Sequence, residues 1–261
     1  MNINIGVSTS CFYPLETEKA LEKVAAAGVK YTEIFFNAQS ELTDTFVDLL
    51  CKIRNEYSIK VTSVHPTMSL AESFMLFSDY ERRYLIGIEQ YKRYAEIAAK
   101  LGADYIIMHG GKPNHAIDNL GYCERFLNVA RAVRENGATL LQENVVNYRA
   151  GSIETMQFMV EQLGDEVGFC LDVKQAVRGG YSPVDALCAV HKNIKHLHIS
   201  DHPPEHDCLL PLNGGFDFTK FFETANPLGS SGSAIIEVYR DAYTDYAEIF
   251  KSYDAVKNLI L

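Results

Sequence analysis

The sequence predicts an α/β fold, a single (β/α)8 TIM barrel formed by residues 1–261. Short apolar runs recur eight times and alternate with longer amphipathic segments, and 261 residues divided by eight give about 33 per repeat, the length of one strand–helix unit. The runs are continuously apolar rather than alternating, which is typical of parallel strands covered by helices. A doubly wound open sheet is the structural alternative.

Each element has its own local signal. Three segments repeat apolar residues at helical spacing, and glycines at the ends of predicted helices indicate C-terminal caps before the next strand. Ser78 and Glu81 match a capping box at the start of the second helical segment. The predicted strands are 3–8, 31–35, 60–64, 105–108, 139–142, 167–171, 194–199 and 234–238. The helical faces are Phe46, Leu49, Leu50, Ile53 and Tyr57; Tyr84, Ile88, Tyr91, Ala95 and Ala98; and Met156, Met159, Val160 and Leu163. The capping glycines are Gly28, Gly102, Gly137 and Gly164.

Composition excludes several classes of protein. The 24 Lys and Arg against 34 Asp and Glu give a formal net charge of −10, with no basic block, which argues against a nucleic-acid partner. The sequence has neither the apolar run of a membrane span nor the pattern of a signal peptide. Six scattered cysteines without a CxxC pair indicate reduced thiols. We therefore expect a cytoplasmic protein.

Seven of the apolar runs end in a polar residue that can ionise or bind a metal. In a barrel these positions meet around the C-terminal ends of the strands, where active sites lie. Four of them would place three carboxylates and an imidazole at one point, and that set would repel itself without a cation. Mixed oxygen and nitrogen ligation suits Mn, Co, Zn or Fe, and Mg is an alternative. The seven residues are Glu33, His65, His109, Glu143, Asp172, His198 and Glu237; the four are Glu143, Asp172, His198 and Glu237.

The order of these motifs resembles the xylose isomerase-like superfamily, which includes sugar and sugar-phosphate isomerases and epimerases and the endonuclease IV repair enzymes. The resemblance covers nearly the whole chain. The motifs are His65-Pro66, His109-Gly110-Gly111, Gln142-Glu143-Asn144, Leu171-Asp172-Val173, the run from His196 to Asp201, the run from Asp207 to Phe218, and Ile236-Glu237.

The resemblance implies that Glu143, Asp172, His198 and Glu237 ligate one divalent metal, and that Glu143 and Glu237 are also the catalytic acid and base. Metal coordination of a substrate carbonyl and its adjacent hydroxyl would acidify the C–H bond and stabilise an enediolate. One glutamate removes the proton and the other returns it. The implied activity is that of a carbohydrate isomerase or epimerase. A lyase, or dehydratase, on the same scaffold begins with the same proton abstraction and stays an alternative, and a homodimer stays open.

Endonuclease IV binds three zinc ions, and this sequence matches only part of that set. His65, His109 and Asp207 match further ligands, but Gln175 and Leu209 stand where histidines are expected. Leucine cannot bind zinc, so the repair activity is the less favoured alternative. We expect His65 and His109 to hydrogen-bond substrate, and a second metal at His65, His109 and Glu143 is the alternative.

Other residues near strand ends are candidates for substrate contact. Gln175 can donate and accept hydrogen bonds with a substrate hydroxyl, and Lys174 could bind a phosphate or carboxylate. Arg149 and Arg240 are weaker candidates for the same purpose. Four early aromatic residues could line an apolar wall, although packing is the commoner role for at least half of them. They are Phe12, Tyr13, Phe35 and Phe36.

Overall fold

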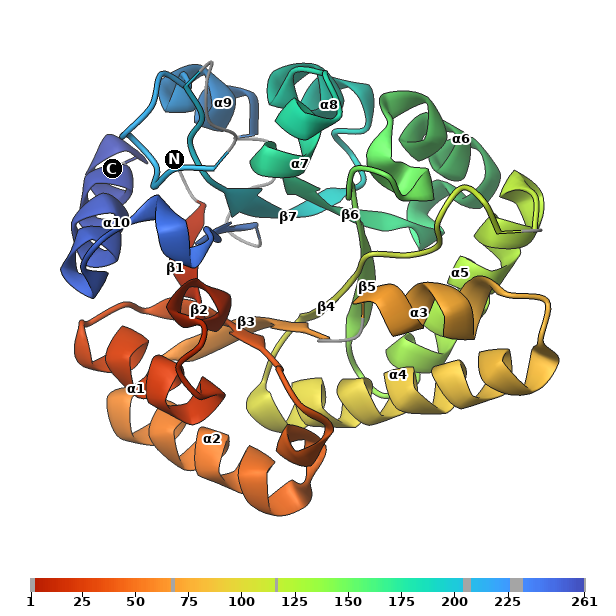
Figure 1. The fold of residues 1–261 in the computed structure, drawn as a ribbon, viewed down its shortest axis with the longest axis horizontal. Helices are drawn as coiled ribbons and strands as arrows, with labels where there is room; N and C mark the ends of the chain where they lie inside the picture. The colour runs from red at the N-terminus through yellow and green to blue at the C-terminus, as the bar shows by residue number, and fades with distance from the viewer. Residues whose placement is uncertain (1–2, 67–68, 116, 204–207, 226–231, 261) are drawn as a thin grey trace.

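In the computed structural model, eight parallel strands form a closed barrel in the order β1-β2-β3-β4-β5-β6-β7-β8, with β8 paired to β1. The structure describes residues 3–66, 69–115, 117–203, 208–225 and 232–260. The strands lie in the centre and the helices form a ring outside them (Figure 1). This architecture confirms the predicted TIM barrel and excludes an open sheet.

The strands agree closely with the predicted runs. Three have the predicted bounds, and the others differ by one or two residues at an end. They are β1 (Asn4–Ser8), β2 (Tyr31–Phe35), β3 (Lys60–His65), β4 (Tyr105–Met108), β5 (Thr139–Glu143), β6 (Gly168–Asp172), β7 (Ile194–Ile199) and β8 (Ser233–Ile236). Register shifts occur between Thr32 and Glu33 in β2 and between Phe169 and Cys170 in β6.

Ten α-helices are seen in the described part of the chain. Their bounds are α1 (Thr17–Ala26), α2 (Asp44–Tyr57), α3 (Ser69–Phe77), α4 (Glu81–Leu101), α5 (Asn119–Arg134), α6 (Ile153–Leu163), α7 (Val173–Arg178), α8 (Pro183–Ala189), α9 (Phe218–Ala225) and α10 (Tyr246–Ile260). Short 3-10 turns occupy Thr9–Phe12, Gln39–Leu42, Arg149–Gly151, Gly164–Glu166 and Arg240–Ala242. All four predicted capping glycines have positive φ.

Two local predictions were wrong. Helix α4 begins at Glu81 with Tyr80 at its N-cap and no side-chain cap, so Ser78 and Glu81 do not form a capping box. In α2 the buried stripe is Val47, Leu50 and Ile53, because Leu49 and Tyr57 point outward. The second error arises because packing against the barrel, rather than helical period alone, decides which stripe of α2 is buried.

The main core lies between the strands and the surrounding helices, and a small second cluster lies inside the barrel. In β4 and β5, Ile106 and Leu140 belong to the main core, whereas their neighbours Ile107 and Leu141 form the inner cluster with Cys170. Successive side chains of a strand point to opposite faces, so the inner cluster fills the barrel interior. Nearer the C-terminal ends this interior becomes polar, and the candidate site begins there.

Candidate active site

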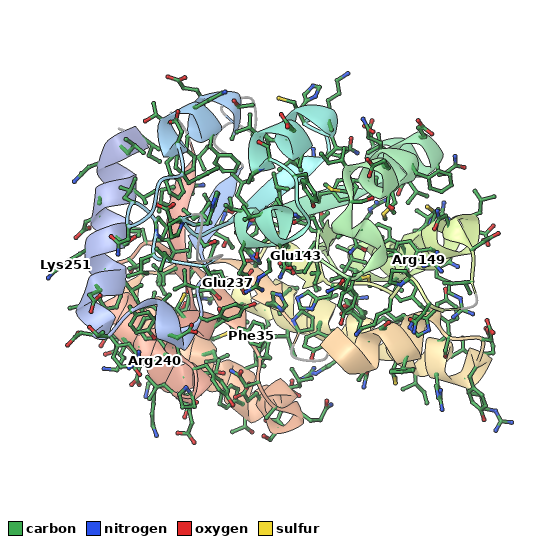
Figure 2. All side chains as sticks on the ribbon, turned by 45° about the horizontal axis from the view of Figure 1, so that its top comes forward. Phe35, Glu143, Arg149, Glu237, Arg240 and Lys251 are labelled. Atoms are coloured by element: carbon green, nitrogen blue, oxygen red, sulfur yellow. The ribbon has the colours of Figure 1, made fainter. Side chains whose placement is uncertain are left out.

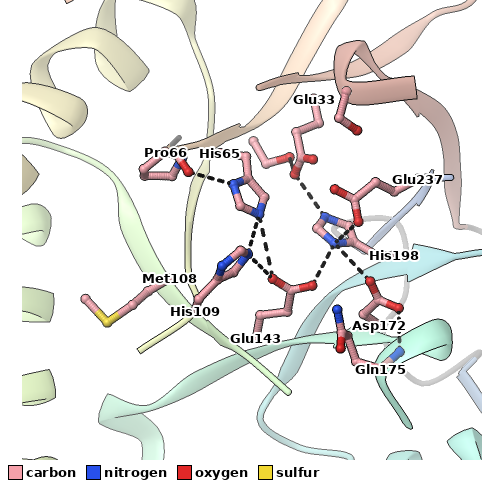
Figure 3. Close-up of polar contacts among 12 residues, drawn as sticks. Glu33, His65, Pro66, Met108, His109, Glu143, Asp172, Gln175, His198 and Glu237 are labelled. Atoms are coloured by element: carbon pink, nitrogen blue, oxygen red, sulfur yellow. Dashed lines mark hydrogen bonds and ion pairs between the residues drawn. The ribbon is translucent and has the colours of Figure 1, made fainter. Parts of the chain in front are cut away.

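The four predicted metal ligands lie together at the C-terminal end of the barrel. Glu143 and Asp172 are the last residues of β5 and β6, His198 is the fifth residue of β7, and Glu237 directly follows β8. One ligand atom from each lies within 4.8 Å of the others. Figure 3 shows the three carboxylates around one edge of the His198 imidazole.

The imidazole of His198 is the centre of this group. Its Nδ1 atom lies 3.4 Å from Glu143 Oε1, 3.3 Å from Glu237 Oε2 and 3.9 Å from Asp172 Oδ2. Among the described residues, Nδ1 of His198 and Oε2 of Glu143 are buried and lack a hydrogen-bond partner of acceptable geometry. Orphaned buried donors and acceptors cost stability unless a ligand satisfies them. The donor set therefore fits a bound cation.

Local structure fixes the position of Asp172. Its backbone N–H donates to Asn144 Oδ1 (2.7 Å), and its carbonyl accepts from Asn144 Nδ2 (3.1 Å). Its Oδ1 accepts from the backbone N–H of Gln175 (3.0 Å), which caps α7. The side-chain oxygen of Gln175 in turn accepts from the N–H of Val146 (3.1 Å). Gln175 thus lies beside the site, and its side chain also supports the loop after β5.

Lys174 lies inside the carboxylate group rather than at its rim. Its Nζ is 2.7 Å from Asp172 Oδ2 and 3.0 Å from Glu237 Oε2, and its side chain is only 3% exposed. Burial lowers the pKa of Lys174, but Asp172 and Glu237 outweigh burial and raise that pKa well above its ordinary value. The sequence did not predict this pairing, because nothing in the run Asp172-Val173-Lys174 indicates that the ammonium turns back toward the strand end.

The three carboxyl groups differ in their ionisation. Burial raises the pKa of Asp172, Lys174 partly offsets that effect, and the neighbouring carboxylates raise it again, to about 6. Burial also opposes ionisation of Glu237, but Lys174 and His198 outweigh it and lower its pKa. For Glu143, burial is outweighed by the histidines around it, and its pKa is well below the ordinary value. Both predicted catalytic glutamates are therefore ionised at neutral pH.

His65 and His109 adjoin the other oxygen of Glu143. His109 Nε2 is 2.9 Å from Glu143 Oε2 and 3.0 Å from His65 Nε2. His65 Nδ1 donates to the carbonyl of Pro66 (3.0 Å), which directs its Nε2 toward Glu143, 3.6 Å away. Ligand atoms of these three residues also lie within 4.8 Å of one another. Glu143 therefore stands between two groups of potential ligands.

A cavity of about 290 Å³ opens beside Glu237 and Lys174. Its wall includes Tyr13 and Phe35, while Phe12 and Phe36 are fully buried in the core, so two of the four aromatic candidates face the cavity. The cavity is about as large as the smaller ligand pockets of proteins. Its lining residues are Ser10, Tyr13, Phe35, Asn37, Lys174, Glu237, Val238, Tyr239 and Arg240.

The two candidate arginines donate hydrogen bonds to neighbouring protein groups, most of them backbone carbonyl oxygens. Arg240 lines the cavity, but its guanidinium donates to the carbonyl of Tyr243 at 2.8 Å. Arg149 donates to Asn119 Oδ1 (2.7 Å) and to the carbonyl oxygens of His115 (3.1 Å) and Ile117. Figure 2 shows Glu143 and Glu237 near the middle of the molecule, with Arg149 and Arg240 on opposite sides of them.

Glu33, which the sequence places after the apolar start of its strand, lies in the middle of β2 rather than at its C-terminal end. Its side chain is fully buried in the barrel interior. There it contacts Nε2 of His198, the ring nitrogen that does not face the other three carboxylates. His196, two residues before His198, is also fully buried there. Sequence reasoning missed this arrangement, although the pattern His196-Leu197-His198 places both histidines on the same face of one strand.

The fold and site define a class: a parallel (β/α)8 barrel with a carboxylate and histidine cluster at the C-terminal ends of its strands. The model of the xylose isomerase-like TIM barrel family matches residues 21–257, and the chain belongs to that family.

Solved structures with the same fold share little sequence with this chain. A D-tagatose 3-epimerase-like protein has 20% identity and a TM-score of 0.81, covering 99% of this chain and 97% of its own. A 3-keto-D-glucoside 4-epimerase from E. coli has 17% identity and a TM-score of 0.77, and the match covers 98% of this chain and 99% of the epimerase chain. The probable 3-DHS dehydratase of petrobactin synthesis from Bacillus anthracis has 13% identity and a TM-score of 0.74, covering 99% of each chain. A comparison with curated proteins gives no significant match.

One predicted residue lies outside the described part of the chain. It is Asp207, which matches an endonuclease IV ligand, while Leu209 pairs through its backbone with Asp201. Within the ranges that the structure describes, no helix has the length and apolar character needed to span a membrane. All six cysteines are free thiols, as their spacing predicted.

Proposed function

We propose that this chain is a divalent-metal-dependent sugar or sugar-phosphate isomerase or epimerase. The observation that supports it best is the convergence of Glu143, Asp172, His198 and Glu237, which would hold the ion, beside a cavity suited to a small ligand. Three carboxylates and the ammonium of Lys174 leave a net charge of −2 when the imidazole is neutral, which one divalent ion balances. A bound Mn, Co, Zn or Mg ion would polarise the carbonyl and neighbouring hydroxyl of a ketose and acidify the C–H bond.

Glu237 and Glu143 are the proposed proton-transfer residues. Glu237 lies on the cavity wall and is kept ionised by Lys174, so it is available to accept a proton from substrate carbon. Glu143 is more deeply buried, with His109 Nε2 2.9 Å from its Oε2, and once it has taken up a proton it is the residue that returns one to the substrate. Return to the opposite face gives an epimer, and return to the neighbouring carbon gives an isomer.

His65, His109, Lys174 and Gln175 are the proposed substrate-binding residues. The charge of Lys174 is shared between two carboxylates, so we expect it to contact a hydroxyl or carbonyl oxygen rather than to anchor a phosphate. Because the ammonium of Lys174 is already paired, we propose a free ketose rather than a phosphorylated one as the substrate. A second ion at His65, His109 and Glu143 is the alternative use of the two histidines, supported by the approach of their Nε2 atoms to Glu143.

The test is deuterium exchange from solvent into a panel of free and phosphorylated ketoses, with Mn, Co or Mg added to the metal-stripped protein. We expect exchange with at least one ketose, and a loss of about 10²–10⁴-fold in Glu143→Gln and in Glu237→Gln. The matched control is Glu161→Gln, an exposed glutamate of α6, which we expect to leave exchange unchanged. Metal analysis of the wild type distinguishes one ion per chain from two.

A wild type that binds no divalent ion, or exchange that survives both glutamate substitutions, would refute the proposal. A dehydratase shares the first proton abstraction, and one similar structure carries that description. Product analysis separates the two classes, since loss of water produces a conjugated chromophore and epimerisation does not.

A further inference from the structure

Adjoining the proposed metal centre lies a second polar group that shares His198 with it and whose other members the proton-transfer scheme does not use. It occupies the barrel interior on β1, β2, β3, β7 and β8, and its members are fully or almost fully buried. The members are Ser8, Glu33, Ser63, His196, His198 and Ser233. Buried polar residues in a barrel interior need a reason, because apolar side chains would fill the same space at lower cost.

Glu33 is held in one orientation by its neighbours. The hydroxyl of Ser63 donates to Oε2 (2.8 Å), and the hydroxyl of Ser8 donates to Oε1 (3.1 Å). The third contact is the Nε2 atom of His198, 3.0 Å from Oε2. Two serines on the neighbouring strands β1 and β3 thus aim this carboxylate at the imidazole, as Figure 3 shows for the Glu33 to His198 contact.

The contact determines how His198 presents its ring. An ionised carboxylate only accepts hydrogen bonds, so Nε2 of His198 must bear the proton that Glu33 accepts. The lone pair of the neutral ring is then on Nδ1, the atom that lies 3.3–3.9 Å from the three carboxylates and lacks a hydrogen-bond partner among the residues described. Nε2 of the ring is therefore bound to Glu33, and Nδ1 is directed toward the three carboxylates of the proposed metal centre.

We infer that Glu33 is a positioning residue for the metal centre: it fixes the orientation and tautomer of His198, so that Nδ1 is the ligand atom. The inference rests on the proposed metal site. Carboxylates behind ligating histidines increase ligand basicity and hold the ring in place, and their replacement typically weakens metal binding about 10–100-fold. Glu33 itself does not contact the cavity, so its effect passes through His198.

The test measures Zn²⁺ affinity by competition with a chelator and locates the ring protons by ¹H–¹⁵N NMR of the Zn²⁺-loaded protein. In the wild type we expect His198 to keep its proton on Nε2. In Glu33→Gln we expect Zn²⁺ affinity to fall about 10–100-fold. The control is Thr32→Val, in the same strand as Glu33. It removes the buried hydrogen bond that Thr32 donates to the Val7 carbonyl of β1 (2.8 Å), leaves the Glu33 to His198 contact in place, and should leave the affinity unchanged.

Each outcome decides the question. Equal Zn²⁺ affinity in Glu33→Gln and wild type, or a proton on Nδ1 of His198 in the loaded wild type, overturns the role of Glu33 while leaving the metal centre standing. An equal loss of affinity in Thr32→Val overturns it too, because general loosening of β2 would then explain the effect. Failure of the wild type to bind Zn²⁺ refutes the metal centre and this inference together. The NMR measurement needs only the wild type, so it can still overturn the inference if Glu33→Gln does not fold.

Discussion

Replacement of Lys174 by methionine should destabilise the metal-free protein and increase its response to a metal ion. Methionine keeps most of the apolar stem and removes the ammonium, which lies 2.7 Å from Asp172 Oδ2 and 3.0 Å from Glu237 Oε2. The side chains of Lys174, Asp172 and Glu237 are 3%, 1% and 13% exposed, so water can replace little of the lost interaction.

The expected magnitude follows from this burial. Removal of one partner from a buried ion pair typically costs about 3–5 kcal/mol, because the remaining charge stays in the interior. Here the lower end applies, since the pKa of Asp172 is already raised to about 6 and that carboxyl can take up a proton when Lys174 is lost. A loss of about 3 kcal/mol lowers the melting temperature of a chain of this size by about 6–12 °C.

The assay is thermal unfolding in EDTA at pH 7.5 and pH 5.5, followed by the same scans with added Mn²⁺. The deficit should be smaller at pH 5.5, because loss of the ammonium raises the pKa of Asp172 further and the acid is then neutral. Added Mn²⁺ should raise the melting temperature of the variant more than that of the wild type, since the ion can replace the missing positive charge. The control Lys19→Met breaks an exposed pair with Glu16 and should change little.

A Lys174→Met protein that melts within about 2 °C of the wild type in EDTA at pH 7.5 would refute the reasoning, because a buried pair could not be lost at so small a cost. An equal deficit at both pH values would show that lost packing, rather than charge, explains the change.

Two other substitutions test strand β1 and helix α3. Gly6→Ala would place a Cβ 2.4 Å from the Tyr31 carbonyl oxygen, so we expect urea unfolding to show a loss of about 1–3 kcal/mol in the free energy of unfolding. The control Gly215→Ala, where the added Cβ meets nothing within 4 Å, should lose none. Equal stabilities of the two variants would contradict this expectation. Burial raises the pKa of Glu72 in the folded protein, so its stabilising contribution is present below its ordinary pKa and disappears as pH rises through the raised value. The free energy of unfolding of Glu72→Gln should therefore rise relative to that of the wild type as the pH increases from 4.5 to 8. Parallel profiles of unfolding free energy against pH for the two proteins would contradict this prediction.

Much of the fold could be predicted because its signals are local. The strand Tyr105–Met108 is a continuous apolar run, whereas polar residues interrupt the apolar ones in Tyr31–Phe35 and Ile194–Ile199; all three have the predicted bounds. Helix orientation was harder to predict: Leu49 and Tyr57 fit the helical period of α2 as well as Val47 does, but only packing against the barrel decides which stripe is buried.

The sequence by itself determined the eight strand–helix units and placed Glu143, Asp172, His198 and Glu237 at or next to the ends of four strands, so closure of the barrel had to bring them together. Only the tertiary structure decided that Lys174 pairs with two of these carboxylates and that Glu33 lies behind His198. The physical reason is that such contacts depend on strand register and side-chain direction. The register shift at Thr32 and Glu33 helps set which β2 residues face the interior, and no local pattern encodes it.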